Sequence, residues 1–308
     1  MFSVEHYVDG RLQIRREHLT GIRCRISPER IRRNISSEYH PPATDETCPF
    51  CPGRIERETP TFPDGTRIRC GKSLTFPNLY PFAPCHTVTV ITPEHSTTTF
   101  TAGEIRDALT GQVRSLIPAG GYPSINWNLL PSAGASMVHP HLQGIAGPEP
   151  TWLTGRYIDG SRRYLSQSGR TFRDDHVDAE AASDRLLFED GAILWAASPV
   201  PIGEYEVRGY LPAASLEGAV PHIPALSRGI VRVTEFYHAL GVYAFNMAIH
   251  FDRQGDENGF GAFCSIIARM NPNPESRNDS AFMERLHLEP VVLTLPEDLG
   301  RAFRDHTV

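Results

Sequence analysis

The feature that most constrains this chain is an internal repeat in the order of its elements. The segment 74–96, LTFPNLYPFAPCHTVTVITPEHS, is followed by the similar segment 193–215, ILWAASPVPIGEYEVRGYLPAAS, and Pro212 lies 119 residues after Pro93. Self-similarity at a fixed offset is typical of a duplicated module. The sequence therefore favours two related halves, although any α+β chain can repeat such elements by chance.

Each copy has the order strand, helix, strand, strand. In the first copy, residues 86–92 alternate β-branched and polar side chains as a strand does, and Thr101–Ile117 has apolar residues at helical spacing. Two more strands are expected over 124–130 and around the segment MVHPHLQGIA. The second copy has its helix at Leu226–Leu240 and strands at 245–251 and 263–270. We predict an α+β fold of tandem modules with mostly antiparallel sheets and packed helices, divided into residues 1–178 and 179–308.

Composition excludes several classes of protein. The 308 residues are 40% hydrophobic and 21% charged, which is ordinary for a globular chain with a real core. No run approaches eighteen apolar residues and the net charge is −6, so we expect neither a membrane nor a nucleic acid as partner. The N-terminus does not resemble a secretory signal, and the six cysteines are too few for a disulfide framework. A reduced, cytoplasmic location follows, with some thiols free to hold metal.

The strongest local signal is the segment His139-Pro140-His141-Leu142-Gln143. On a strand, residues two apart face the same way, so His139, His141 and Gln143 are expected on one face. A neutral imidazole can attack phosphorus and form a covalent phosphoramidate. Gln143 and the backbone amides of the nearby segment 134–136 could then stabilise charge on the phosphoryl oxygens. The alternative is a pair of hydrogen-bonded structural histidines.

A second signal is Cys48-x-x-Cys51, whose spacing chelates one ion through two thiolates, usually zinc. No second CxxC exists, so histidines must complete the site, and His95 and His139 are candidates. A scattered cysteine or His86 could replace one of them, although a surface histidine at the start of a strand is the simpler interpretation of His86. A redox CxxC is the rival hypothesis, but the prolines around these cysteines favour a loop over the helix start that such motifs use.

Taken together, five segments in order resemble the galactose-1-phosphate uridylyltransferase family, the duplicated branch of the histidine-triad superfamily. They span most of residues 25–145 and read SPERIRR (27–33), CPFC (48–51), NLYP (78–81), TPEHS (92–96) and NLLPSAGASMVHPHLQ (128–143). The resemblance implies that both modules are histidine-triad-like. Residues 1–178 would be the catalytic half with HPHLQ and the zinc site, and residues 179–308 a divergent second half.

The resemblance also assigns roles to residues. It implies one structural zinc ion bound by Cys48, Cys51, His95 and His139. It makes His141 the nucleophile that carries the nucleotide and Gln143 the contact to the transferred phosphoryl group. By the same matching, the phosphate contacts are Arg30 and Arg33, and the nucleotide contacts are Asn78, Asn128 and Ser136.

Two segments depart from the family pattern. The strand that often carries a second pair of histidine ligands reads SIIAR (265–269), so no second metal is expected. In the stretch that corresponds to the hexose-phosphate segment, Ser280–Leu286, the phenylalanine survives but the family's lysine, glycine and glutamate do not align. The machinery for nucleotide transfer therefore looks intact, while the acceptor pocket looks rebuilt.

The implied activity is that of a nucleotidyltransferase of the hexose-1-phosphate uridylyltransferase type. It would move a nucleoside monophosphate between phosphate-bearing compounds through a nucleotidyl-His141 intermediate. Its substrates would be a nucleotide sugar or another nucleoside diphosphate compound and a phosphate-bearing acceptor. The alternatives are a phosphorylase or hydrolase of nucleotide sugars or dinucleotides that uses the same histidine, and a zinc-stabilised nucleotide-binding protein without turnover. The resemblance leaves a homodimer open.

Overall fold

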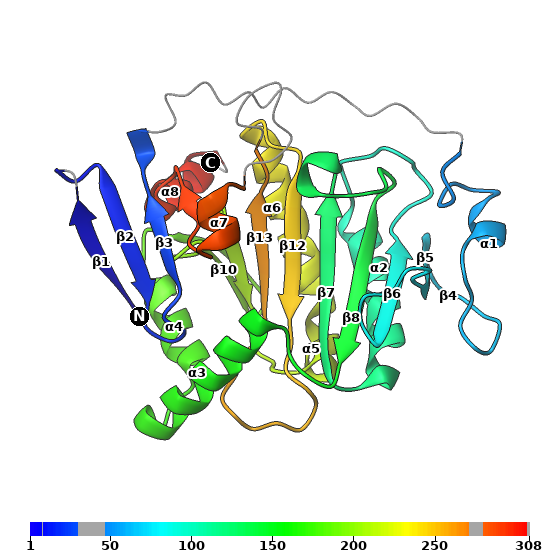
Figure 1. Cartoon of the computed structure of the whole chain (residues 1–308), viewed down its shortest axis with the longest axis horizontal. Helices are drawn as coiled ribbons and strands as arrows, with labels where there is room; N and C mark the ends of the chain where they lie inside the picture. The colour runs from blue at the N-terminus through cyan, green and yellow to red at the C-terminus, as the bar shows by residue number, and fades with distance from the viewer. Residues whose placement is uncertain (8, 30–46, 271–279, 307–308) are drawn as a thin grey trace.

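A ten-stranded antiparallel sheet runs through the computed structural model, which describes residues 1–7, 9–29, 47–270 and 280–306 (Figure 1). Its strand order is β4-β5-β6-β8-β7-β12-β13-β11-β10-β9. The first five strands along the chain are β4 (Ile68–Cys70), β5 (Ser73–Pro77), β6 (Cys85–Val90), β7 (Tyr122–Leu129) and β8 (His141–Gly147). The second five are β9 (Leu186–Asp190), β10 (Ile193–Ala197), β11 (Val207–Tyr210), β12 (Phe245–His250) and β13 (Phe263–Ala268).

The two groups of five strands have the same internal order. Counted from the edge of the sheet inward, β4-β5-β6-β8-β7 corresponds to β9-β10-β11-β13-β12. The groups meet where β7 pairs antiparallel with β12, and Asn128 lies directly opposite Asn246. The α+β class with duplicated, mostly antiparallel modules is therefore confirmed. The boundary between residues 178 and 179 stays a prediction.

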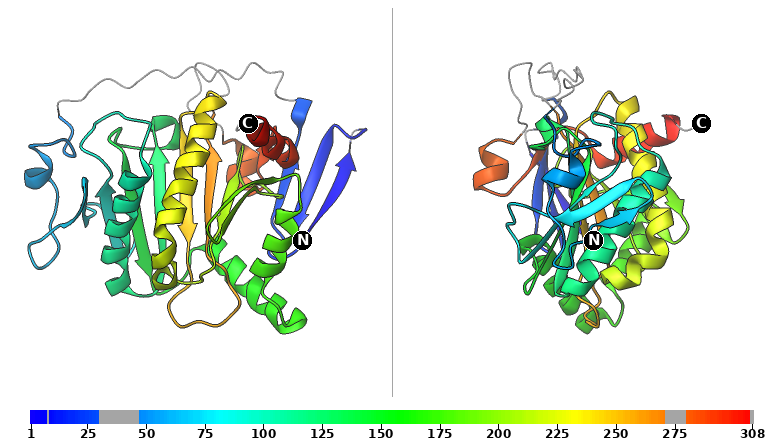
Figure 2. Two further views of the ribbon diagram at one scale, coloured as in Figure 1. Left: turned by 180° about the vertical axis from the view of Figure 1, so that it is seen from behind. Right: turned by 90° about the vertical axis from the view of Figure 1, so that its right-hand side faces the viewer.

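Two long helices cover one face of this sheet. Figure 2 shows α2 (Ala102–Leu116) and α6 (Ile223–Ala239) side by side, and they contact each other. The helix predicted over Thr101–Ile117 is thus confirmed, and Thr101 caps it in a reciprocal box with Glu104. Other helices that lie wholly within the described residues are α1 (Ile55–Glu58), α3 (Trp152–Ser168), α4 (Phe172–Ala181), α5 (Leu216–Ala219), α7 (Phe282–Leu286), α8 (Pro296–His306) and the short 3-10 turns η2 (Ile117–Ala119), η3 (Pro131–Ala133) and η4 (Val220–His222).

In both α2 and α6, a glycine packs directly against the sheet. A Cβ atom on Gly111 of α2 would lie 2.3 Å from Thr75 Oγ1, and a Cβ on Gly229 of α6 would lie 2.3 Å from the Trp195 ring. Both contacts are far shorter than packed atoms allow, so only glycine permits this approach. The glycines occupy corresponding places in the two halves, which agrees with duplication.

This close approach gives a stability prediction. Gly111→Ala should lower the free energy of unfolding by about 1–3 kcal/mol, because the new methyl group forces α2 away from Thr75. The matched control is Gly103→Ala in the same helix, where the nearest atom to the new Cβ is 3.8 Å away. That change should be neutral or stabilise by up to about 1 kcal/mol. Chemical denaturation of both variants decides the matter, and equal stability would contradict the packing argument.

The other face of the sheet differs between the halves. Over the second half it is covered by α3, α4 and a smaller sheet of β1 (Phe2–Tyr7), β2 (Leu12–Glu17), β3 (Arg23–Ile26) and β14 (Val291–Val292) (Figure 1). There the Arg208 guanidinium is buried, lies 2.7 Å from Glu206 and donates to the Tyr157 hydroxyl at 2.6 Å. A buried ionic cluster thus occupies the place in the second half that corresponds to the place of His141 and Gln143 in the first half. No helix among the described residues is long and apolar enough to cross a membrane.

Candidate active site and metal cluster

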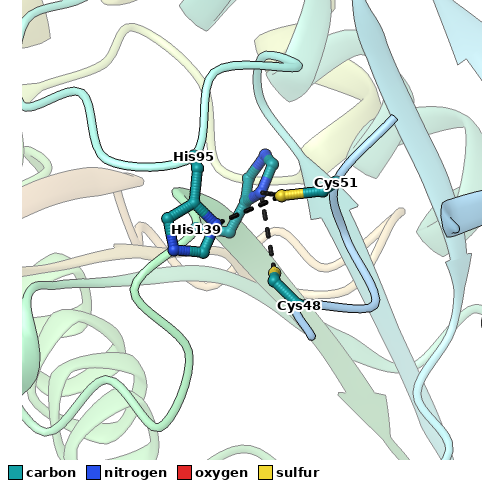
Figure 3. Close-up of side chains that lie close together, drawn as sticks. All are labelled: Cys48, Cys51, His95 and His139. Atoms are coloured by element: carbon teal, nitrogen blue, oxygen red, sulfur yellow. Dashed lines mark hydrogen bonds between the residues drawn. The ribbon is translucent and has the colours of Figure 1, made fainter. Parts of the chain in front are cut away.

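Four side chains that are distant in sequence converge beside the start of β8. Figure 3 shows Cys48, Cys51, His95 and His139 pointing toward one another, and their ligand atoms all lie within 4.8 Å of each other. The Cys51 sulfur is 3.2 Å from His95 Nδ1 and 3.7 Å from His139 Nδ1, and the Cys48 sulfur is 3.8 Å from His139 Nδ1. The structure thus brings together the four residues that the resemblance assigned to the metal.

The surroundings of the cluster suit a metal ion. His139 Nε2 donates to the Thr92 carbonyl at 2.8 Å, which leaves the Nδ1 lone pair directed at the two sulfurs. Histidine ligands in metal sites are usually held by such a hydrogen bond from the second ring nitrogen. The thiolate and imidazole set is one that zinc and other borderline metals prefer. Cys48 and Cys51 lie in a turn closed by the Cys51 amide and the Cys48 carbonyl, as expected of a loop.

The segment HPHLQ is a strand only in part. β8 begins at His141, so the expectation that His139 shares the strand is wrong. Pro140 lacks an amide donor, and its carbonyl accepts from Ile91 instead. The resulting bend lets His139 join the cluster while His141 takes the first position of the strand.

His141 has a defined tautomer. Its Nδ1 donates to the carbonyl of His139 at 2.8 Å, so Nε2 carries the lone pair. The side chain is 6% exposed, and no hydrogen bond within the described residues involves Nε2. Burial lowers the pKa of His141, opposed in part by the hydrogen bond to the His139 carbonyl. A neutral ring with an accessible Nε2 is the form that can act as a nucleophile.

Phe50, between the two cysteines, packs against both histidines of HPH. Its ring centroid lies 5.4 Å from that of His141 and 6.2 Å from that of His139, with edge-on geometry in both pairs. The CPFC loop therefore holds the cluster and also forms one wall of the His141 site. Sequence reasoning assigned no role to this phenylalanine.

Gln143 follows two residues after His141 on β8 and faces the same side of the sheet. Its side-chain oxygen lies 3.1 Å from His86 Nε2, and its backbone carbonyl accepts from Asn126 at 3.3 Å. No hydrogen bond within the described part of the chain involves the Gln143 side-chain nitrogen. That nitrogen can therefore donate to a bound group.

His86 departs from its sequence interpretation. It is 5% exposed rather than on the surface, and burial lowers its pKa, while the hydrogen bond with Gln143 acts in the opposite sense. It also lies outside the Cys–His cluster. Its place on β6, the strand that pairs with β8, brings it to Gln143, and the strand order needed to see this is not local in sequence.

The predicted nucleotide contacts occupy different environments. The Asn78 side-chain nitrogen lies 3.0 Å from His86 Nε2, and its side-chain oxygen accepts from the Tyr80 amide at 2.8 Å, so Asn78 shapes the loop between β5 and β6. Asn128 accepts from Asn246 at 2.6 Å, and Ser136 is exposed in the connection between β7 and β8. Arg30 and Arg33 lie outside the described residues.

The turn before HPH is less open to phosphate than the sequence suggested. The amides of Gly134 and Ala135 donate within the turn, to Pro131 at 2.9 Å and to Leu130 at 3.2 Å. Leu130 has φ +71°, an uncommon value for a residue with a side chain. These two amides are therefore committed to the turn and do not form the phosphate cradle expected for them.

The second half contributes to the site through Asn246 and Arg269. Asn246 donates to the Asn128 side chain and, at 2.8 Å, to the Ala133 carbonyl, while Arg269 donates to Asn246 at 2.6 Å. Neither residue was predicted from the sequence to lie at the site. The correspondence between the strands FNMAIHF and INWNLLP is the signal that could have pointed to Asn246.

Comparison with known proteins gives relatives at low identity. No protein-family model matches the chain. An uncharacterised protein of Archaeoglobus fulgidus is 25% identical over 273 residues, which cover 85% of this chain and 82% of the relative.

Solved structures match over nearly the whole chain. An ADP-glucose phosphorylase from Arabidopsis thaliana with bound ADP-glucose has a TM-score of 0.77 at 18% identity, covering 96% of this chain and 99% of that one. A galactose-1-phosphate uridylyltransferase-like protein of the same plant has a TM-score of 0.73 at 17% identity, with coverages of 95% and 98%. A uridylyltransferase has a TM-score of 0.70 at 19% identity, with coverages of 95% and 97%. The chain therefore has the fold of uridylyltransferases and ADP-glucose phosphorylase, and the resemblance found in its motifs is confirmed at the level of the fold.

Proposed function

We propose that this protein is a nucleotidyltransferase that moves a nucleoside monophosphate between phosphate-bearing compounds through a covalent nucleotidyl-His141 intermediate. The observation that carries the proposal is the hydrogen bond from His141 Nδ1 to the His139 carbonyl. It leaves the Nε2 lone pair for attack, two residues before a glutamine whose amide nitrogen is available. The shared fold and the five sequence motifs support the same activity.

The reaction takes place in two displacements. The Nε2 lone pair attacks the α-phosphorus of a nucleotide sugar, so that a nitrogen–phosphorus bond forms as the bond to the bridging oxygen breaks and a sugar phosphate departs. The ring of His141 then carries a positive charge, which the His139 carbonyl stabilises through the Nδ1 hydrogen bond. A phosphate oxygen of the acceptor next attacks the same phosphorus and releases His141.

The residues around His141 position the substrate and stabilise charge. The Gln143 amide nitrogen would donate to the phosphoryl oxygens, where negative charge develops. Leaving group and acceptor are both phosphates and already anionic, so the mechanism requires no strong general base. We keep Arg30 and Arg33 as phosphate contacts, and Asn78, Asn128 and Ser136 as nucleotide contacts, on the strength of the motif matches.

We further propose that the Cys48, Cys51, His95 and His139 cluster holds a structural zinc ion. When bound, this ion would fix the CPFC loop against β8. His139 would be held by the metal at Nδ1 and by Thr92 at Nε2, and its carbonyl would hold the His141 ring. The six free cysteines fit a reduced cytoplasmic location, which is part of the same proposal.

The same chemistry with inorganic phosphate or water as acceptor is the second candidate. The altered segment Ser280–Leu286 favours it, because Phe282 and Leu286 of α7 are 63% and 79% exposed among the described residues and are not buried in a closed sugar pocket there. Division of the chain into a catalytic half, 1–178, and a divergent half, 179–308, remains part of the proposal.

The test is the mass of the intact protein after incubation with a panel of nucleotide sugars. We expect an added mass equal to one nucleoside monophosphate, and the mass identifies the base. Product analysis with a sugar 1-phosphate, with inorganic phosphate and with water then separates transferase, phosphorylase and hydrolase. Tight nucleotide binding with no adduct and no turnover for any member of the panel would refute the proposal and favour a binding protein.

A further inference from the structure

His86 lies between the predicted catalytic residues and a loop, with polar neighbours on three sides. Its Nε2 is 3.1 Å from the Gln143 oxygen and 3.0 Å from the Asn78 nitrogen, and its Nδ1 is 3.4 Å from the Phe82 amide nitrogen. The Phe82 ring packs edge-on against the imidazole at 4.2 Å between centroids. The ring is therefore fixed in place, and the position of its proton decides what each neighbour can do.

Two tautomers satisfy these neighbours unequally. With the proton on Nε2, the ring donates to the Gln143 oxygen and accepts from the Phe82 amide at Nδ1, while the Asn78 nitrogen, itself a donor, opposes the Nε2 proton. With the proton on Nδ1, the ring accepts from Asn78 but opposes the Phe82 amide and directs a lone pair at the Gln143 oxygen. The first arrangement satisfies two contacts and the second only one, so the Nε2 proton is favoured.

The Gln143 oxygen, 3.1 Å from His86 Nε2, and a proton on that nitrogen stabilise each other. An amide whose oxygen accepts from His86 must present its nitrogen, a donor, in the opposite direction. The reversed amide would present its oxygen to the substrate and would repel the anionic phosphoryl group. Because the two orientations have nearly the same shape, packing alone does not choose between them.

We propose that His86 is a positioning residue that holds the Gln143 amide with its nitrogen toward the transferred phosphoryl group. This inference rests on the proposed function. It gives His86 a role in the reaction rate through Gln143 and not through contact with the substrate.

The second half of the chain has a side-chain contact at the two positions that correspond to His86 and Gln143. Ser265 and Glu206 occupy the positions on β13 and beside β11 that Gln143 and His86 occupy on β8 and β6, and Ser265 donates to Glu206 at 2.7 Å. The contact between the two strand positions is present in both halves, but its side chains are a serine and a glutamate in one half and a glutamine and a histidine in the other. The imidazole is thus specific to the half that carries HPHLQ.

The test compares two polar replacements of His86. In His86→Gln the new amide nitrogen reaches the place of Nε2 and can still donate to Gln143, whereas His86→Asn is shorter by one methylene and cannot. We expect adduct formation on His141 to stay within a few-fold of wild type in the first variant. In the second we expect it to fall about 10- to 100-fold, less than loss of the donor itself, with little change in KM.

A double variant separates positioning from general disruption. In a Gln143→Ala background, His86→Asn should cause no further loss of rate, because the group that it positions is gone. Wild-type rates in His86→Asn, or an equal loss in both backgrounds, would overturn the inference. Failure of the wild-type protein to form any adduct would instead refute the proposed function, so the two failures are distinguishable.

Discussion

Replacement of His141 with alanine is expected to abolish the nucleotidyl adduct and to reduce nucleotide exchange by about 10⁴- to 10⁶-fold, as loss of a covalent nucleophile does elsewhere. The reason is specific to one atom. Among the histidines of HPH, His139 has Nδ1 directed at two sulfurs and Nε2 bound to Thr92, whereas His141 keeps Nε2 available. The intact mass after incubation with a nucleotide sugar, and the rate of exchange between two phosphates, measure the effect.

The matched control is His18→Ala, which removes an exposed histidine distant in sequence from HPH and should leave both readings unchanged. Nucleotide binding to the His141→Ala variant, measured by calorimetry, should persist because the remaining contacts are present. Exchange at a near wild-type rate in that variant would rule out the covalent route and require direct displacement.

Replacement of Cys51 with serine is expected to remove most of the bound metal and to lower the melting temperature. Cys51 contacts both histidines of the cluster, and the cluster ties the 48–51 loop to the residues before β8. Because metal bound only by the folded state adds its binding free energy to stability, its loss should cost several kcal/mol. Metal analysis of the purified protein and melting with and without a chelator measure both effects.

Cys70→Ser is the control, because Cys70 is a free cysteine on β4 that does not belong to the cluster. It should retain wild-type metal content and wild-type sensitivity to the chelator. If Cys51→Ser retained full metal content and unchanged melting, the assignment of the site would be wrong. The identity of the ion is read from the same metal analysis, and zinc is expected.

The duplicated architecture and the chemically active segments were visible in the sequence. Periodicity gave α2, α6 and β7 to within a few residues, because those patterns depend on neighbours only a few positions apart. The spacing of Cys48 and Cys51 predicted a chelating pair of thiolates. The position of His141 two residues after His139 predicted two imidazoles that lie close in space. His95, 44 residues from Cys51, was a candidate ligand because no second CxxC exists, and the resemblance to a known family assigned it to the metal.

Details that depend on proline and on hydrogen-bond competition were harder to predict. The sequence pattern continued a strand through His139, but Pro140 interrupts it and separates the roles of the two histidines. The segment 134–136 likewise looked able to offer free amides, yet the carbonyls of Pro131 and Leu130 accept those of Gly134 and Ala135. In the turn, the outcome depends on which nearby carbonyl lies closest to each amide, and the sequence pattern does not contain that information.

By itself, then, the sequence determined the repeated order of elements, the α+β class, the pair of thiolates and the paired histidines of HPH, because each depends on local spacing. The choice of His141 as the nucleophile came from the resemblance. Only the tertiary structure decided that His86 contacts Gln143, that Asn246 of the second half supports Asn128, and that a buried ionic cluster seals the second half. These contacts join β6 to β8 and β7 to β12, which are neighbours in the sheet but not in the chain. Strand order, fixed by burial of both halves against α2 and α6, is what brings them together.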